Sequence, residues 1–217
     1  MDNVHTDGES DRAAGLKCRR YTTGESMASQ ESILELLPSP GDWTEAEYFP
    51  LADRGRLVEL SDGELEVLPL PTWFHQSILL RLSFSLHAFV IAHKLGLICF
   101  APLPARLWPG KVREPDLMFM SAEHQDRIDW YWGVPDLAVE IISEGTEHKD
   151  RVVKRSEYAQ AGILEYWIID PEALTVEQLR LQDGAYAMVS FYSQFDTLTS
   201  PTFPGWSILL DDLFAKT

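Results

Sequence analysis

The chain has 217 residues, which is enough for one domain with a single hydrophobic core. A composition of 45% hydrophobic and 11% aromatic residues is globular and excludes the disordered and fibrous classes. The formal net charge of -16, from 18 Lys and Arg against 34 Asp and Glu, argues against binding of nucleic acid over a broad basic surface, although it allows a local basic patch.

Two segments of the chain differ in composition. Residues 1–38 are rich in small and charged side chains, so we expect a flexible polar extension, in which Met27 is a candidate native start. Residues 39–217 are expected to form one domain. Cys18 and Cys99 belong to no motif for a disulfide framework or a zinc site, and we find neither an apolar leader nor a run as long as a membrane span. These features predict a cytoplasmic protein without a membrane segment.

Helices and strands are predicted to follow one another throughout residues 39–217. In chain order we expect a short helix from Thr44, a hairpin across Asp62-Gly63, a long helix from Thr72 that stops at Gly96, strands at 97–108 and 115–120, a loop at 127–135, a strand at 134–143, a helix at 148–162, a strand at 165–170, a hairpin at 174–191 and a tail at 203–214 that packs back onto the sheet. The long helix presents one apolar face, formed by Ile78, Leu82, Leu86, Phe89 and Ile91. This order predicts an α/β or α+β domain with a mixed central sheet flanked by helices.

The strand "VPDLAVEIIS", residues 134–143, is predicted to be buried on both faces, yet it contains one acid. Alternate residues point to opposite faces, so the neighbours of Glu140 on its own face are the apolar Ala138 and Ile142. A buried carboxylate without a partner is costly, and Glu140 is therefore expected to have one. The alternative is an acid on an edge strand that faces water.

A second carboxylate stands at the start of the preceding strand, "EPDLMFM", as Asp116. If the two strands are neighbours, Asp116 and Glu140 converge, and they repel each other unless they share a cation or a proton. A hard divalent cation such as Mg²⁺ binds a few carboxylate oxygens plus water. A backbone carbonyl of Ile141 or Ile142 would complete the protein ligands.

A lysine follows in the helix "HKDRVVKRSEYAQAG". Asp150 and Lys154 are spaced i and i+4, so they share one helix face, and the short turn before the helix would bring Lys154 near the two acids. There it would position a water or hydroxide and stabilise a pentacovalent phosphorane. The alternatives are a surface lysine paired with Asp150 or Glu157, and an Asp150 that serves only as an N-cap or ion-pair partner.

Other side chains near these motifs have two interpretations. Arg106, Lys111 and Arg113, together with "HKDRVVKR", form either a phosphate-contacting patch or a solvated charged surface. Tyr158 and Trp167 are predicted to be core residues.

Asp116, Glu140 and Lys154 together resemble the PD-(D/E)xK nuclease motif. More narrowly, the chain resembles the Uma2 family of endonucleases, a restriction-endonuclease-like group formerly called a domain of unknown function. The resemblance lies in "RLVELSDGELEV", "REPDLMFM", "GVPDLAVEIIS" and "KDRVVKRSEYAQAGILEYWIIDP", which with the turns between them cover most of residues 43–215. The last stretch is the most specific, because its Asp, Lys, Tyr, Gly and "EYW" recur in order across a strand-helix-strand unit.

The resemblance implies a restriction-endonuclease-like core and an endonuclease that hydrolyses DNA as a homodimer, with Mg²⁺ as cofactor and Mn²⁺ as its substitute. It implies that Asp116 and Glu140 bind the metal. The usual lysine two residues after the acid is replaced here by Ile142, and Lys154 from the following helix is similar in place to the family's lysine.

Two further residues, Glu59 and His75, match family positions near the site. By this resemblance Glu59 would supply a carboxylate to the metal or to a water, and His75 would contact a phosphate or order Glu59. The alternatives are an ordinary strand glutamate and an ordinary histidine at a helix N-terminus.

Two other functions stay open at this point. One is a catalytically inactive binding or assembly module. Three features fit it: the acidic net charge, the lack of an extended basic surface, and the extra acid Glu144, where family members often have small or proline residues. A metal-dependent hydrolase of small nucleotide substrates also fits the acidity better than an enzyme acting on DNA.

Overall fold

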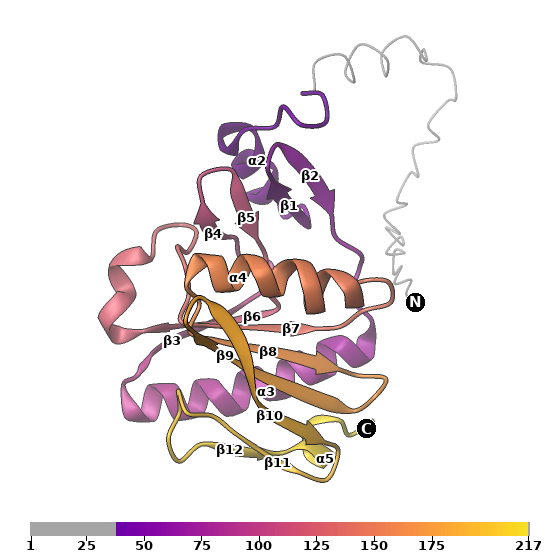
Figure 1. Cartoon of the computed structure of the whole chain (residues 1–217), viewed down its shortest axis with the longest axis vertical. Coiled ribbons are helices and arrows are strands. Elements are labelled where there is room, and N and C mark those ends of the chain that lie inside the picture. Colours follow the sequence, from indigo (N-terminus) through magenta and orange to yellow (C-terminus); the bar gives the residue numbers. More distant parts are fainter. Residues whose placement is uncertain (1–37, 217) are drawn as a thin grey trace, which may run out of the picture. The chain divides into compact units, whose positions relative to one another are not determined.

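A six-stranded mixed sheet forms the centre of the fold (Figure 1). The computed structural model describes residues 38–216, so the extension expected for residues 1–38 lies, apart from Pro38, outside the described residues. The strand order is β10-β9-β8-β7-β6-β3, and β7 pairs parallel with β8 but antiparallel with β6. The strands are β3 (Gly96–Phe100), β6 (Leu117–Ser121), β7 (Leu137–Ile141), β8 (Glu165–Asp170), β9 (Thr175–Gln182) and β10 (Ala185–Ser193).

Helices cover both faces of this sheet, as predicted (Figure 1). On one face the long helix α3 buries Ile78, Leu82 and Leu86 in a core shared with β7, whereas Ile91, expected on the same face, is 50% exposed. On the other face α4 packs Tyr158 against the sheet. The C-terminal tail joins the core on the α3 side, which confirms that it packs back onto the sheet. These elements are α3 (Trp73–His93), α4 (Arg155–Ala161), β11 (Thr197–Thr199), β12 (Ser207–Leu209) and α5 (Leu210–Leu213).

A smaller four-stranded sheet, in the order β2-β1-β5-β4, carries its own helix, α2. Its first hairpin turns at Asp62 and Gly63, both at positive φ, as the sequence predicts. Its helix begins after Thr44, whose backbone N–H donates to the Glu47 carboxylate. The elements are α2 (Glu45–Ala52), β1 (Val58–Ser61), β2 (Glu64–Val67), β4 (Ala105–Trp108) and β5 (Lys111–Arg113). Because β5 runs almost directly into β6, the two sheets meet close to Asp116.

The structure differs from the predicted elements in three places. The segment 97–108 holds two strands of different sheets, β3 and β4. The region after β6 contains a short 3-10 helix, η1 (Ala122–Arg127), which no periodicity had indicated. The helix expected at 148–162 begins as a π-helical segment, η2 (Lys149–Lys154), before it continues as α4. Single π-helical turns are often found at functional sites.

Gly96 does not end the long helix. The helix ends at Lys94, which follows His93 and takes the left-handed backbone conformation, with φ 55°. Gly96 instead lies in β3, where a Cβ atom would stand 2.0 Å from the carbonyl oxygen of Met120 on β6. The glycine is therefore required by the close approach of the two strand backbones.

Replacement of this glycine tests the close approach. Gly96→Ala should lower the free energy of unfolding by about 3 kcal/mol, because the strands must move apart. Gly55→Ala is the matched control, since Gly55 also has positive φ but a Cβ atom added to it would meet nothing within 4 Å, and it should cost only about 1 kcal/mol. Equal losses for the two variants in urea-induced unfolding would contradict the steric explanation.

The helix α3 also has the length and composition of a membrane span. Trp73–His93 has 21 residues, and an 18-residue window within it has a mean hydropathy of 1.2; it is the one such helix in the described part of the chain. This corrects the expectation that no run approaches that length. One face of α3 belongs to the core of the large sheet, which accounts for much of its apolar composition.

Candidate active site

A cleft of about 240 Å³ lies where the small sheet, the start of α3, the β6–β7 pair and η2 meet. Four of its polar lining residues come from distant parts of the sequence: His75, Asp116, Glu140 and Lys154. The structure thus gathers four of the five predicted site residues in one cleft. The fifth, Glu59, is fully buried beside it and contacts Lys154.

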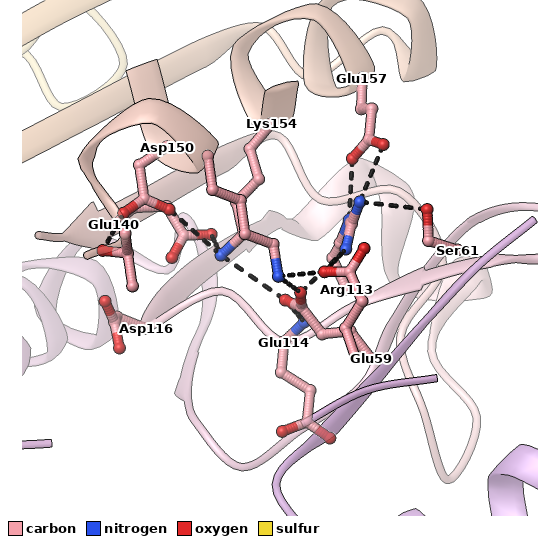
Figure 2. Close-up of polar contacts among 12 residues, drawn as sticks. Glu59, Ser61, Arg113, Glu114, Asp116, Glu140, Asp150, Lys154 and Glu157 are labelled. Carbon is pink, nitrogen blue, oxygen red and sulfur yellow. Dashed lines mark hydrogen bonds and ion pairs between the residues drawn. The ribbon is translucent and has the colours of Figure 1, made fainter. Parts of the chain in front are cut away.

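Glu140 has two partners from the opposite helix. It lies on β7, a central strand, with its side chain on the α4 face, and only 5% of that side chain is exposed. Lys154 Nζ is 2.8 Å from Glu140 Oε1 (Figure 2). The Tyr158 hydroxyl donates to the same oxygen at 2.5 Å. The edge-strand alternative for Glu140 is therefore wrong, and the expected partner exists.

Asp116 is held against the neighbouring strand. It directly precedes β6, and its Oδ2 accepts a hydrogen bond from the backbone N–H of Ile141 at 2.7 Å. The strands β6 and β7 are antiparallel neighbours, as the convergence of the two acids requires. His75 Nε2 lies 3.2 Å from the same Asp116 oxygen, so this histidine orders Asp116 and not Glu59.

Lys154 is a buried lysine whose ammonium is surrounded by acids. Only 6% of its side chain is exposed, and Nζ lies 3.5 Å from an oxygen of Glu59 and 3.5 Å from one of Asp150. Burial acts to lower the pKa of Lys154, but Glu140, Glu59 and Asp150 outweigh it and raise the pKa well above its usual range. The surface-lysine alternative is wrong, and the cation stays charged at neutral pH.

Glu59 belongs to an ion-pair network behind Lys154 (Figure 2). Its carboxylate accepts from Arg113 at 2.9 Å, from Lys149 at 2.6 Å and from the backbone N–H of Glu114 at 3.0 Å. Burial acts to raise the pKa of Glu59, but Lys154, Arg113 and Lys149 hold it well below its usual range. Glu59 is thus a permanent anion that positions Lys154, and its contacts are with cations of the protein.

Neither interpretation of Lys111 and Arg113, a phosphate-contacting patch or a solvated charged surface, holds in the structure. Arg113 is fully buried and paired with Glu59, Glu66 and Glu157. Lys111 is also buried and contacts Glu157 at 2.9 Å. These cations are used inside the protein, where they pair with acids from the β1–β2 hairpin and from α4.

Two contributors to the site were missed from the sequence. Asp150 lines the cleft with 5% of its side chain exposed, and it accepts a hydrogen bond from Thr146 Oγ1 at 2.7 Å. Asp150 is an ion-pair partner of Lys154, which was one of the two alternatives for it, and it also lines the cleft. It is not an N-cap. Tyr158 is a core residue as predicted, yet its hydroxyl contacts Glu140. The signal for both was their spacing of four residues on either side of Lys154, which places all three on one helix face.

The chemistry of the donor groups fits a hard divalent cation. Burial raises the pKa of Glu140 and outweighs the Lys154 ammonium, which acts to lower it, and the carboxylates of Asp150 and Asp116 raise it further. Across residues 38–216 no three His, Cys, Asp or Glu side chains form a ready-made metal cluster. A cation would accordingly be held by Asp116, Glu140 and several waters, which is the kind of ligand set that Mg²⁺ favours.

A mixed sheet between two helices, with acids on adjacent strands and a lysine from the next helix, defines the restriction-endonuclease-like class. A solved structure described as "a putative nuclease belonging to DUF820" from Anabaena variabilis has this fold: it superposes with a TM-score of 0.66 at 18% identity, over 79% of this chain and 97% of that chain. The family model Uma2, described as "Putative restriction endonuclease", matches residues 45–211. The chain therefore belongs to the Uma2 family, which supports a nuclease function. No curated protein matches it.

The hydrogen bond between Tyr158 and Glu140 should contribute measurably to stability. Tyr158→Phe is expected to lower the free energy of unfolding by about 2 kcal/mol, because it removes a donor from a buried carboxyl group. Tyr192→Phe, which removes a hydroxyl from a more exposed site, should cost about 0.5 kcal/mol or less. Urea-induced unfolding measures both, and equal costs would show that the Tyr158 hydroxyl does not stabilise Glu140.

Proposed function

We propose that the protein is an endonuclease that hydrolyses phosphodiester bonds in DNA with Mg²⁺ as cofactor, for which Mn²⁺ substitutes. The observation that carries this proposal is the convergence in one cleft of Asp116, Glu140 and a buried, charged Lys154. Membership of the Uma2 family supports the nuclease reaction.

The residues have separate roles in this proposal. Asp116 and Glu140 would hold the cation, which when bound polarises the scissile phosphate and stabilises the charge on the leaving oxygen. Lys154 donates hydrogen bonds to the attacking water and to the phosphate oxygens as negative charge grows on them.

The remaining residues position these three. His75 and the Ile141 N–H fix the Asp116 carboxylate. Tyr158 fixes Glu140, and Glu59 keeps the Lys154 ammonium charged and directed toward the cleft. Because the groups are fixed before substrate binds, little reorganisation is needed during the reaction.

A plasmid-nicking assay with Mg²⁺ and with Mn²⁺ tests the proposal. The wild-type protein should nick the plasmid, and Glu140→Ala should lower the rate at least about 100-fold, because the cation loses a ligand. Glu172→Ala is the matched control and should keep the wild-type rate, since Glu172 is exposed and does not line the cleft. Equal nicking by the wild type and a folded Glu140→Ala variant would contradict the mechanism.

A second prediction separates the lysine from the metal ligands. A Lys154→Met variant whose circular dichroism spectrum shows that it is folded should bind Mn²⁺ at least as tightly as the wild type in calorimetry, because a competing positive charge is gone, yet it should nick DNA at least about 100-fold more slowly. Lys94→Met, at an exposed position, should change neither property. Normal nicking by Lys154→Met would remove the lysine from the mechanism.

The same experiments address the other two functions. A wild-type protein that binds neither Mg²⁺ nor Mn²⁺ would favour the binding or assembly module, to which the exposed Glu144 beside the cleft lends support. Stronger turnover of free nucleotides than of DNA would favour a hydrolase of small nucleotide substrates. The homodimer and the cytoplasmic location also stay predictions, and light scattering of the purified protein measures the first.

A further inference from the structure

Two buried polar atoms in the described part of the chain have no hydrogen-bond partner: Oε2 of Glu114 and Nδ1 of His75. Both residues line the same cleft. A buried polar atom without a partner is unfavourable in a folded protein, and such atoms are rare. Their occurrence together makes this cleft a candidate site for a bound molecule that supplies the missing hydrogen bonds.

Glu114 is not part of the ion-pair network around Lys154. Only 4% of the residue is exposed, and the contact to its other oxygen, Oε1, is a long one of 3.4 Å from the Tyr48 hydroxyl. Figure 2 shows its side chain directed away from Glu140 and Lys154. The proposed reaction uses Asp116, two residues further along the chain, but leaves Glu114 without a task.

The cleft also has apolar walls. Besides Glu114, its lining includes Leu57, Leu68, Pro69, Pro71 and Pro102. Sites for organic ligands are typically clefts of this kind, in which a few polar groups among apolar side chains fix the orientation of the ligand. We name Glu114 together with these five residues the Glu114 subsite.

We propose that the Glu114 subsite binds the nucleobase next to the scissile phosphate, and that Glu114 accepts a hydrogen bond from an exocyclic amino group of that base. The inference rests on the proposed function, since a phosphodiester at Asp116 and Glu140 brings its flanking nucleotide into the same cleft. Carboxylates accept hydrogen bonds from the cytosine amino group in known complexes, and pockets for single bases combine apolar walls with such contacts. A base in this subsite is unpaired, so the substrate is single-stranded or has the base turned out of the duplex.

The test compares cleavage of single-stranded oligonucleotides that carry dC, dA or dT beside one cleavable phosphodiester. The wild type should cleave the dC and dA substrates about tenfold faster than the dT substrate, which lacks an amino group. In Glu114→Gln this preference should fall below about twofold, because an amide both donates and accepts hydrogen bonds. Glu123→Gln, at an exposed position in η1, is the control and should keep the wild-type preference.

Two measurements guard against a folding artefact and identify the source of the base. With the wild-type protein, N4,N4-dimethylcytosine in place of dC removes both amino hydrogens and should slow cleavage to the dT level. Free dCMP and dTMP are then added as competitors. Weak competition by both indicates a base within a strand, whereas strong competition by dCMP alone indicates that a free nucleotide also fits the subsite.

The possible failures are distinguishable. If the wild-type protein neither nicks plasmid nor cleaves any oligonucleotide, the proposed function fails and the inference fails with it; if it nicks plasmid but cleaves no single-stranded oligonucleotide, only the inference is overturned. If cleavage is normal but equal for dC, dA and dT, only the inference is overturned. If Glu114→Gln loses Mn²⁺ binding in calorimetry, Glu114 is a metal ligand and the base-binding role is overturned.

Discussion

The structure depends on the burial of one carboxylate, that of Glu140, in the middle of the central strand β7. A buried charge without partners is too costly for a fold of ordinary stability. Lys154 at 2.8 Å and the Tyr158 hydroxyl at 2.5 Å offset that cost. Both partners come from one helical segment at a spacing of four residues, so the pairing fixes how η2 and α4 lie on the sheet. The same contacts place an ammonium group and an acid in the wall of the cleft.

A second network, behind the first, joins the small sheet to the same helix. Arg113 on β5 connects Glu59 on β1 with Glu157 on α4, and Glu59 in turn contacts Lys154. Removal of one member would leave an uncompensated buried charge, which is strongly destabilising. The arrangement explains how a protein with a net charge of -16 keeps several cations close to the cleft. Because those cations already have partners inside the protein, they leave little unpaired positive charge at the surface of the cleft.

Much of the fold followed from local sequence, and part of the site did not. Alternation along residues 134–143 predicted a strand buried on both faces, and the Asp-Gly turns predicted both hairpins, because these signals act over a few residues. The role of Gly96 was wrong because it depends on Met120 on a different strand. The pairing of His75 with Asp116 joins residues 41 apart in the chain. Arg113 looked like a surface cation because its burial is decided by three acids from other elements.

A crystal structure of the wild-type protein grown with Mn²⁺, measured at a wavelength where manganese scatters anomalously, tests most directly whether Asp116 and Glu140 hold the metal ion. We expect one strong anomalous peak between the carboxylates of Asp116 and Glu140, with Lys154 Nζ nearby. The same crystal form of Glu140→Gln should lack this peak. A wild-type cleft without manganese, or a peak held by Glu114 and not by Glu140, would contradict the assignment of the site.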